Sequence, residues 1–178
     1  MVFSQDGGIG NDAAGDAGTE ADASQACEPI EPDGGVCNSL SLMGSPVHIM
    51  CEEGPTPRLQ PSGGTVIDGT YALVSGRVFN TGCPFSLELR SVTWNVCGAS
   101  WAVAGDEKQD DGPEAQYSLD FVVTRAGQTH LMSDPACGPP GGARQTLGFD
   151  AAGSSLTLYY YYDAAATMLY RVEEYVRL

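Results

Sequence analysis

Positive charge is scarce in this sequence. Its 8 lysine and arginine residues stand against 23 aspartate and glutamate residues, so the formal net charge is −15 at pH 7. The few basic residues are scattered along the chain and form no basic patch. A chain this negative repels both a phosphate backbone and anionic lipid headgroups. The charge therefore predicts no binding to nucleic acid or to anionic membranes, and it favours solubility.

The residues and motifs of common active sites are also few. The sequence has only two histidines, His48 and His130, and it contains no Gly-x-Ser-x-Gly nucleophile elbow. Two histidines without a clustered third ligand make a poor zinc site, and no two cysteines have the C-x-x-C spacing of zinc ribbons or thioredoxin-type sites. We therefore expect no catalytic residue, no cofactor and no metal, and we predict that the protein is not an enzyme.

Carboxylates are abundant, but their positions do not indicate an active site. A pair of them could serve hydrolysis, and the acidic stretch from Asp106 to Glu114 could bind a hard cation. We instead interpret that stretch as a solvated loop. Charged residues on an alternating strand usually face solvent, and we interpret the carboxylates on expected strands in this way: Glu88, Asp120, Glu173 and Glu174.

The chain has no run of 18 apolar residues and no signal peptide at its start, so we expect no transmembrane segment. It does have six cysteines, and an even number in an acidic, turn-rich chain is typical of disulfide-bonded proteins from oxidising compartments. The excess of Arg over Lys is typical of a GC-rich bacterial genome. We thus predict an extracytoplasmic bacterial protein, located at the cell surface or outer membrane, in the periplasm, or secreted. We expect that a signal was removed, and a lipid anchor could have been lost with it.

Composition divides the chain into three parts. Residues 1–26 are rich in Ala, Asp and Gly and poor in large apolar side chains, which predicts a disordered acidic tether. Residues 27–61 hold three cysteines and six prolines, and we predict an irregular strap with a strand only at Val47–Met50. Residues 62–178 form the body of the protein.

Six cysteines allow many pairings, and the sequence alone does not choose among them. We predict Cys27–Cys37 and Cys83–Cys97, because each pair closes a short local loop. The remaining pair, Cys51–Cys137, would pin the strap to a long loop rich in Pro and Gly. Closing a loop of about 15 residues stabilises a fold by roughly 3 kcal/mol in the chain-entropy description.

The body consists of short runs in which apolar and polar residues alternate, separated by turns rich in Gly, Pro and Asp. Three of the expected turns contain Gly98, Gly127 and Gly153. The clearest run is Tyr117 to Val123. Another run changes its apolar parity between Leu89 and Val92, which predicts a β-bulge near Ser91. About eight strands follow one another at intervals of roughly 8–15 residues, with no convincing helix. This spacing predicts an all-β domain, an antiparallel up-and-down β-barrel of lipocalin-like form, with a β-sandwich as the alternative.

Two segments of the body carry a family resemblance. Gly63 to Leu73 reads GGTVIDGTYAL, and the C-terminal part contains Cys137-Gly138-Pro139 followed by the run from Leu147 to Leu158. These segments resemble secreted, lipocalin-like lipoproteins of myxobacterial type, over residues 63–178, and the acidic tether is similar to the spacer such proteins carry. The resemblance implies a β-barrel and a cell-envelope setting, and it implies no particular activity.

The most unusual motif is the run Tyr159-Tyr160-Tyr161-Tyr162. On a strand, Tyr160 and Tyr162 share a face with Leu156 and Leu158, while Tyr159 and Tyr161 lie on the other face. We expect at least two of the four to be partly exposed. We predict an aromatic ligand- or partner-binding platform; the alternative is a set of ordinary cross-strand aromatic contacts. The candidate site residues are Tyr159, Tyr160, Tyr161, Tyr162, Tyr170, Tyr175, and Trp94 or Trp101.

Three classes of function remain open. We predict a non-catalytic binding or interaction module of the cell envelope, with an envelope protein or an unidentified ligand as partner. The first alternative is a lipocalin-like carrier of a small apolar ligand, and the second is a secreted hydrolase or protease inhibitor. A large internal pocket would favour the carrier. A filled interior with an exposed aromatic patch would favour the interaction module.

Overall fold

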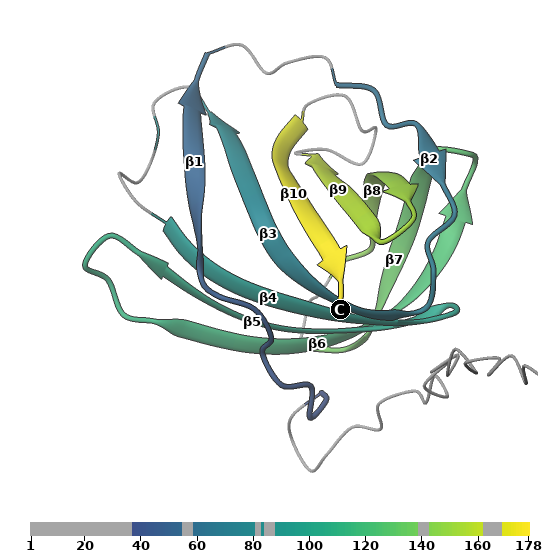
Figure 1. Cartoon of the computed structure of the whole chain (residues 1–178), viewed down its shortest axis with the longest axis horizontal. Helices are drawn as coiled ribbons and strands as arrows, with labels where there is room; N and C mark the ends of the chain where they lie inside the picture. The colour runs from purple at the N-terminus through teal and green to yellow at the C-terminus, as the bar shows by residue number, and fades with distance from the viewer. Residues whose placement is uncertain (1–36, 55–58, 81–82, 84–87, 139–142, 162–168) are drawn as a thin grey trace, which may run out of the picture.

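The computed structural model describes residues 37–54, 59–80, 83, 88–138, 143–161 and 169–178. In these ranges it contains strands and no helix, and so no helix that could cross a membrane (Figure 1). The strands are β1 (Val47–Glu53), β2 (Gly63–Gly64), β3 (Gly69–Asn80), β4 (Glu88–Cys97), β5 (Ser100–Gln109), β6 (Ala115–Ala126), β7 (His130–Cys137), β8 (Gln145–Ala152), β9 (Ser155–Tyr161) and β10 (Leu169–Arg177). The expected all-β class is confirmed.

All ten strands belong to one hydrogen-bonded sheet. From β3 to β10 each strand pairs antiparallel with the next one along the chain, and β10 also pairs antiparallel with β3. The pairings therefore return to the strand from which they start, and the sheet curves round on itself (Figure 1). We call this closed series of pairings the ring.

Tight turns explain why successive strands pair. Gly98, Gly127 and Gly153 connect β4 to β5, β6 to β7 and β8 to β9, and each has a positive φ, of 56°, 82° and 57°. Glycine adopts this backbone conformation without the steric cost that a side chain would add. All three turns were expected from the sequence. They keep neighbouring strands antiparallel and in sequential order.

β1 lies outside this sequential order. It pairs in parallel with β3 between Ile49 and Glu53, and antiparallel with the start of β4 between Val47 and Ile49. β3 and β4 pair directly only at their opposite end, from Gly69 to Ala72. β1 is therefore inserted between β3 and β4 at one end of the ring (Figure 1).

The residues before β1 cross the outer face of β4, β5 and β6. The side-chain amide of Asn38 donates hydrogen bonds to the carbonyl oxygens of Val103 (3.3 Å) and Leu119 (3.1 Å). The backbone N–H of Met43 donates to Oγ1 of Thr93 at 2.7 Å, and Thr93 is fully buried as a result. The strand expected within the strap is present. The predicted tether, residues 1–26, lies outside the described residues, so the division into three parts stays a prediction.

The predicted disulfide pairing is wrong. Cys37 is bonded to Cys137 and Cys51 to Cys83, which excludes Cys27–Cys37, Cys51–Cys137 and Cys83–Cys97. Cys97 is disulfide-bonded as well, and no described cysteine is free. The prediction favoured short loops, whereas the fold requires α-carbons within about 7 Å. The parallel pairing of β1 with β3 sets Cys51 opposite Val78, near the end of β3 and close to Cys83.

The bulge predicted near Ser91 is also wrong. β4 pairs with β5 in unbroken register from Glu88 to Cys97. Glu88 and Arg90 therefore point to the same face as Val92 and Trp94, and all four are buried. The earlier residues of the expected run, Phe85 and Leu87, lie outside the described residues. The parity change was inferred because a charged residue was assumed to face solvent.

Candidate functional site

A cavity of about 610 Å³ opens inside the ring. Side chains from β4, β5, β6, β7, β8, β9 and β10 form its wall, so it is enclosed by the sheet and is not a groove on its outside. Its lining combines aromatic, aliphatic and charged residues: Arg90, Val92, Trp94, Val103, Glu107, Tyr117, Leu119, Phe121, Ser133, Arg144, Gln145, Thr146, Leu147, Tyr160, Tyr161, Tyr170, Arg171, Glu173 and Tyr175.

Aromatic rings close one end of the cavity. Trp94 contacts Trp101 edge to face, with ring centroids 5.7 Å apart, and lies 5.9 Å from Phe121. Beyond Trp94 the interior is filled by buried side chains that include Val96, Trp101 and Leu156. The ring is thus packed on one side of Trp94 and hollow on the other.

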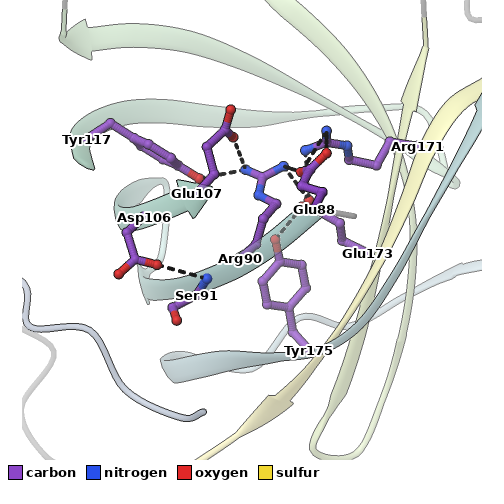
Figure 2. Close-up of polar contacts among 9 residues, drawn as sticks. All are labelled: Glu88, Arg90, Ser91, Asp106, Glu107, Tyr117, Arg171, Glu173 and Tyr175. Carbon is purple, nitrogen blue, oxygen red and sulfur yellow. Dashed lines mark hydrogen bonds and ion pairs between the residues drawn. The ribbon is translucent and has the colours of Figure 1, made fainter. Parts of the chain in front are cut away.

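Arg90 lies at the centre of a charged cluster on the hollow side (Figure 2). Its Nη1 is 3.0 Å from Oε1 of Glu173, and its Nη2 is 3.7 Å from Oε2 of Glu107. Nη2 also donates a hydrogen bond of 2.7 Å to the hydroxyl of Tyr117. Arg90 therefore joins β4 to β5, β6 and β10 across the interior.

Arg171 supplies the second guanidinium of the cluster. Its Nη2 is 3.2 Å from Oε1 of Glu88, and its Nη1 is 3.4 Å from Oε1 of Glu173. Glu173 is thus shared by both arginines, and its other oxygen accepts a hydrogen bond of 2.6 Å from the hydroxyl of Tyr175. Figure 2 shows the carboxylates of Glu88 and Glu173 next to the two guanidinium groups.

Two glycines make room for this arrangement. A side-chain carbon on Gly105 would collide with the ring of Tyr117, so this ring lies flat over the backbone of β5. A side-chain carbon on Gly76 would collide with Ile49 and touch Glu173. The bare backbone at these two places lets Tyr117 and Ile49 reach the interior, where Tyr117 accepts a hydrogen bond from Arg90 and Ile49 joins the apolar core.

Burial shapes the charges of the cluster. Glu88 is 0 % exposed and Glu173 is 2 % exposed. Burial, together with the neighbouring carboxylates of Glu107 and Glu173, raises the pKa of Glu88 from 4.5 to about 7, against the opposing effect of Arg90. Burial alone would lower the pKa of Arg90, but Glu173 and Tyr117 raise it further, so Arg90 stays charged. Glu88 is therefore the member whose charge changes near neutral pH.

Several buried N–H groups of the site have no hydrogen-bond partner among the described residues. They are the Nε atoms of Arg90 and Arg171 and the indole Nε1 of Trp94. Burial and the neighbouring Glu173 raise the pKa of Tyr175, and Trp94 Nε1 opposes this rise without forming a well-aligned hydrogen bond. Oε1 of Glu88 also lacks an aligned hydrogen bond, although it is in ion-pair contact with Arg171. The unused hydrogen-bonding capacity at this site lies mainly with donors.

The structure divides the predicted aromatic residues between two places. Tyr160, Tyr170, Tyr175 and Trp94 line the cavity, and Trp101 packs behind Trp94. Tyr161 borders the cavity, but it packs on the other face with the cluster that contains Tyr159, near His130. Tyr160 shares the inward face with Leu156 and Leu158, as expected. Tyr160 and Tyr161 are half-buried, as expected for at least two of the four consecutive tyrosines.

Tyr159 lies away from the cavity. It packs on the other face of the sheet against Phe79 and Val172, and its hydroxyl donates a 2.5 Å hydrogen bond to Asp150. Tyr162 lies outside the described residues. The four consecutive tyrosines therefore do not form one platform.

The sequence did not reveal the charged part of the site. Glu88 and Glu173 were interpreted as solvent-facing, which is wrong, and Arg90, Arg171 and Tyr117 were not proposed as site residues. The only signal in the sequence was the position of these charged residues along their strands. Glu88 and Arg90 continue the inward parity of Val92 and Trp94, and Arg171 and Glu173 continue that of Tyr175. By contrast, Glu174 is exposed, and Asp120 accepts a hydrogen bond from Asn38.

No family model, curated protein or solved structure matches the chain. Within the described ranges, no three His, Cys, Asp or Glu side chains are grouped so that they could hold a metal ion. What the site can do is therefore argued from its geometry.

Proposed function

We propose that the ring is a lipocalin-like up-and-down β-barrel and that the protein is a binding module that holds a small, largely aromatic or apolar ligand in its cavity. The observation that carries this proposal is the hollow of about 610 Å³ inside the ring. Small-molecule sites are typically concave, of roughly 300–1,000 Å³, and lined by apolar and aromatic side chains with a few polar groups. The cavity has both properties.

The direction of the aromatic side chains supports a ligand carrier over a module that binds a partner protein. Tyr160 and Tyr175 point into the ring, and Trp94 forms the end of the cavity. A protein-binding platform would need these rings on the outer surface. We therefore place the carrier, rather than the interaction module, first.

The carboxylates support the same choice over a hydrolase. A glycosidase-type pair needs one carboxylate free to act on the substrate and a second placed across from it. Glu88 and Glu173 instead share two arginines, and Glu173 has both of its oxygens engaged. We propose a non-catalytic role on this ground.

The cellular location of the protein is also part of the proposal. Two disulfides tie distant parts of the chain together, which suits an oxidising compartment outside the cytoplasm. We also propose that the protein belongs to the lipocalin-like lipoproteins that residues 63–178 resemble. We propose with this a location in a bacterial cell envelope.

Titration with N-phenyl-1-naphthylamine, a neutral apolar dye whose fluorescence rises in apolar surroundings, tests the proposal. Leu119 lines the cavity, and Val122 on the same strand is 47 % exposed. Leu119→Trp should fill the cavity and weaken dye binding at least tenfold. Val122→Trp adds the same side chain on the outer face, and it should leave binding unchanged.

The proposal fails if the wild-type protein binds no dye, or if the two tryptophan variants weaken binding equally. Circular dichroism and thermal unfolding of both variants establish that each is folded. A folded Leu119→Trp protein that binds the dye as well as the wild type would place any dye site outside the cavity.

A further inference from the structure

We infer that the ligand is a small aromatic anion, whose ring lies among the tyrosines and Trp94 and whose anionic oxygens meet the guanidinium groups of Arg90 and Arg171. This inference rests on the proposed function, because it names the chemical class that the cavity accepts. It is carried by the distribution of charge, by the unpartnered donors and by the aromatic lining.

Positive charge is concentrated at the cavity, although the protein is strongly acidic. The chain has only 7 arginines and a net charge of −15, yet three of the arginines line the cavity: Arg90, Arg144 and Arg171. The lining contains only two carboxylates, Glu107 and Glu173. Glu88 lies behind this wall, fully buried. Arg144 is exposed and paired with Asp134, so the guanidinium groups left to meet an anion are those of Arg90 and Arg171.

The hydrogen-bonding groups at the cavity also favour an anionic ligand. The carboxylate of Glu173 is saturated by Arg90, Arg171 and Tyr175, so little acceptor capacity remains for a cationic ligand. Among the described residues of the site, the unpartnered donors are the Nε–H of Arg90, the Nε–H of Arg171 and the indole N–H of Trp94. The one acceptor without a hydrogen bond, Oε1 of Glu88, is in ion-pair contact with Arg171. Buried donors without partners are costly, and a ligand with acceptor oxygens would satisfy them. Arginine binds oxyanions with short, charge-assisted hydrogen bonds.

The rest of the lining suits an aromatic body. Five of the chain's eight tyrosines line or border the cavity, together with Trp94 and Phe121. Aromatic rings pack edge to face or offset against one another and gain more than their buried area alone provides. An aromatic ligand with an oxyanion at one end therefore matches both parts of the wall.

A matched pair of dyes tests the inference. 1-Anilinonaphthalene-8-sulfonate has the same ring skeleton as N-phenyl-1-naphthylamine and adds one sulfonate. We expect the wild-type protein to bind the sulfonate dye at least about tenfold more tightly than the neutral dye, the effect of one charge-assisted hydrogen bond. Leu119→Trp should weaken binding of both dyes, which would locate the sulfonate dye in the cavity.

Charge-preserving variants identify the groups involved. The titrations are made at pH 8, where Glu88 is ionised. At this pH Glu88→Gln/Arg171→Gln removes one negative and one positive charge, so the net charge of the cluster is unchanged, and no carboxylate is left without a partner. It should lower the affinity for the sulfonate dye about tenfold and leave that for the neutral dye within about twofold. Glu88→Gln alone should strengthen binding of the sulfonate dye. Arg77→Gln, at an exposed ion pair with Glu52, is the control and should change neither affinity.

The outcomes separate this inference from the proposed function. If both dyes bind in the cavity equally well, or if Glu88→Gln/Arg171→Gln weakens both to the same extent, the anion inference is wrong and the carrier function stands. If neither dye binds, both are wrong. Selective loss of the sulfonate dye in the double variant, with Arg77→Gln unchanged, supports the inference.

Discussion

The two ends of the ring share eight strands but have different interiors. Near the turn between β4 and β5, the inward side chains are large and apolar, including Val96, Trp101 and Leu156. At the other end the same face carries Arg90 and Arg171 with their carboxylate partners. Burial of apolar surface stabilises a fold directly, whereas a buried ion pair often gains little once the loss of hydration is counted. We therefore expect the packed end to supply most of the stability, and we propose that the charged end recognises the ligand.

The largest expected effect is at the packed end. Phe149 is fully buried in the main core cluster. Phe149→Ala should lower the free energy of unfolding by about 3–5 kcal/mol, because it removes a large apolar side chain and leaves a cavity. Leu119→Ala, at the half-buried wall of the hollow end, should cost less than half as much. Chemical denaturation measures both values, and equal losses would contradict the assignment of stability to the packed end.

A smaller but still large effect is expected from unbalancing the charged end. Arg90→Met removes the guanidinium between Glu88, Glu107 and Glu173, and it should lower the free energy of unfolding at pH 8 by about 3 kcal/mol. Part of this loss should be recovered at pH 5, where Glu88 is protonated and no longer repels the neighbouring carboxylates. Denaturation at the two pH values checks this, and an identical loss at both would show that packing, not charge, causes it.

The smallest effect is the pH dependence of the intact cluster. The pKa of Glu88 rises from 4.5 to about 7 on folding, so between these values the folded protein binds more protons than the unfolded chain. The free energy of unfolding should therefore fall as pH increases from about 4.5 to 7 and then level off, with an amplitude on the order of 1–3 kcal/mol.

The groups that set this pKa lie on the same strand as Glu88 and on two other strands. Glu107 on β5 and Glu173 on β10 raise it, Arg90 on the same strand lowers it, and Arg171 on β10 is in ion-pair contact. Glu88→Gln should flatten the stability profile over this pH range. Glu174→Gln, on an exposed residue of β10, is the matched control and should keep the slope. If Glu88→Gln retained the full slope, another group would be responsible.

The sequence allowed prediction of features that depend on local pattern. The alternation from Tyr117 to Val123 identified β6 and its inward face correctly. The turns at Gly98, Gly127 and Gly153 were expected because glycine and its polar neighbours favour tight reversals. From these turns the antiparallel order of neighbouring strands follows.

Features that depend on contacts between distant segments were not accessible in this way. The disulfide partners of Cys37 and Cys51 are set by how the first described residues cross the sheet, which no local pattern records. Arg90 and Glu173 are inward because each neutralises the other. A single strand shows only a charged residue, for which the solvent-facing interpretation is the usual one. The charged half of the site could therefore not be predicted before the pairing of β3 with β10 was known.

The insertion of β1 has a geometric consequence for the hollow end. β3 and β4 are direct neighbours where the interior is packed, but β1 separates them beside Glu88 and Arg90. A section through the packed end therefore crosses eight strands, and a section through the charged end crosses nine. Because each strand adds about 4.8 Å to the circumference, the circumference of the ring increases by roughly one eighth from the packed end to the charged end. The ring therefore tapers towards its packed end, and the disulfide Cys51–Cys83 holds in place β1, the ninth strand, which widens the charged end.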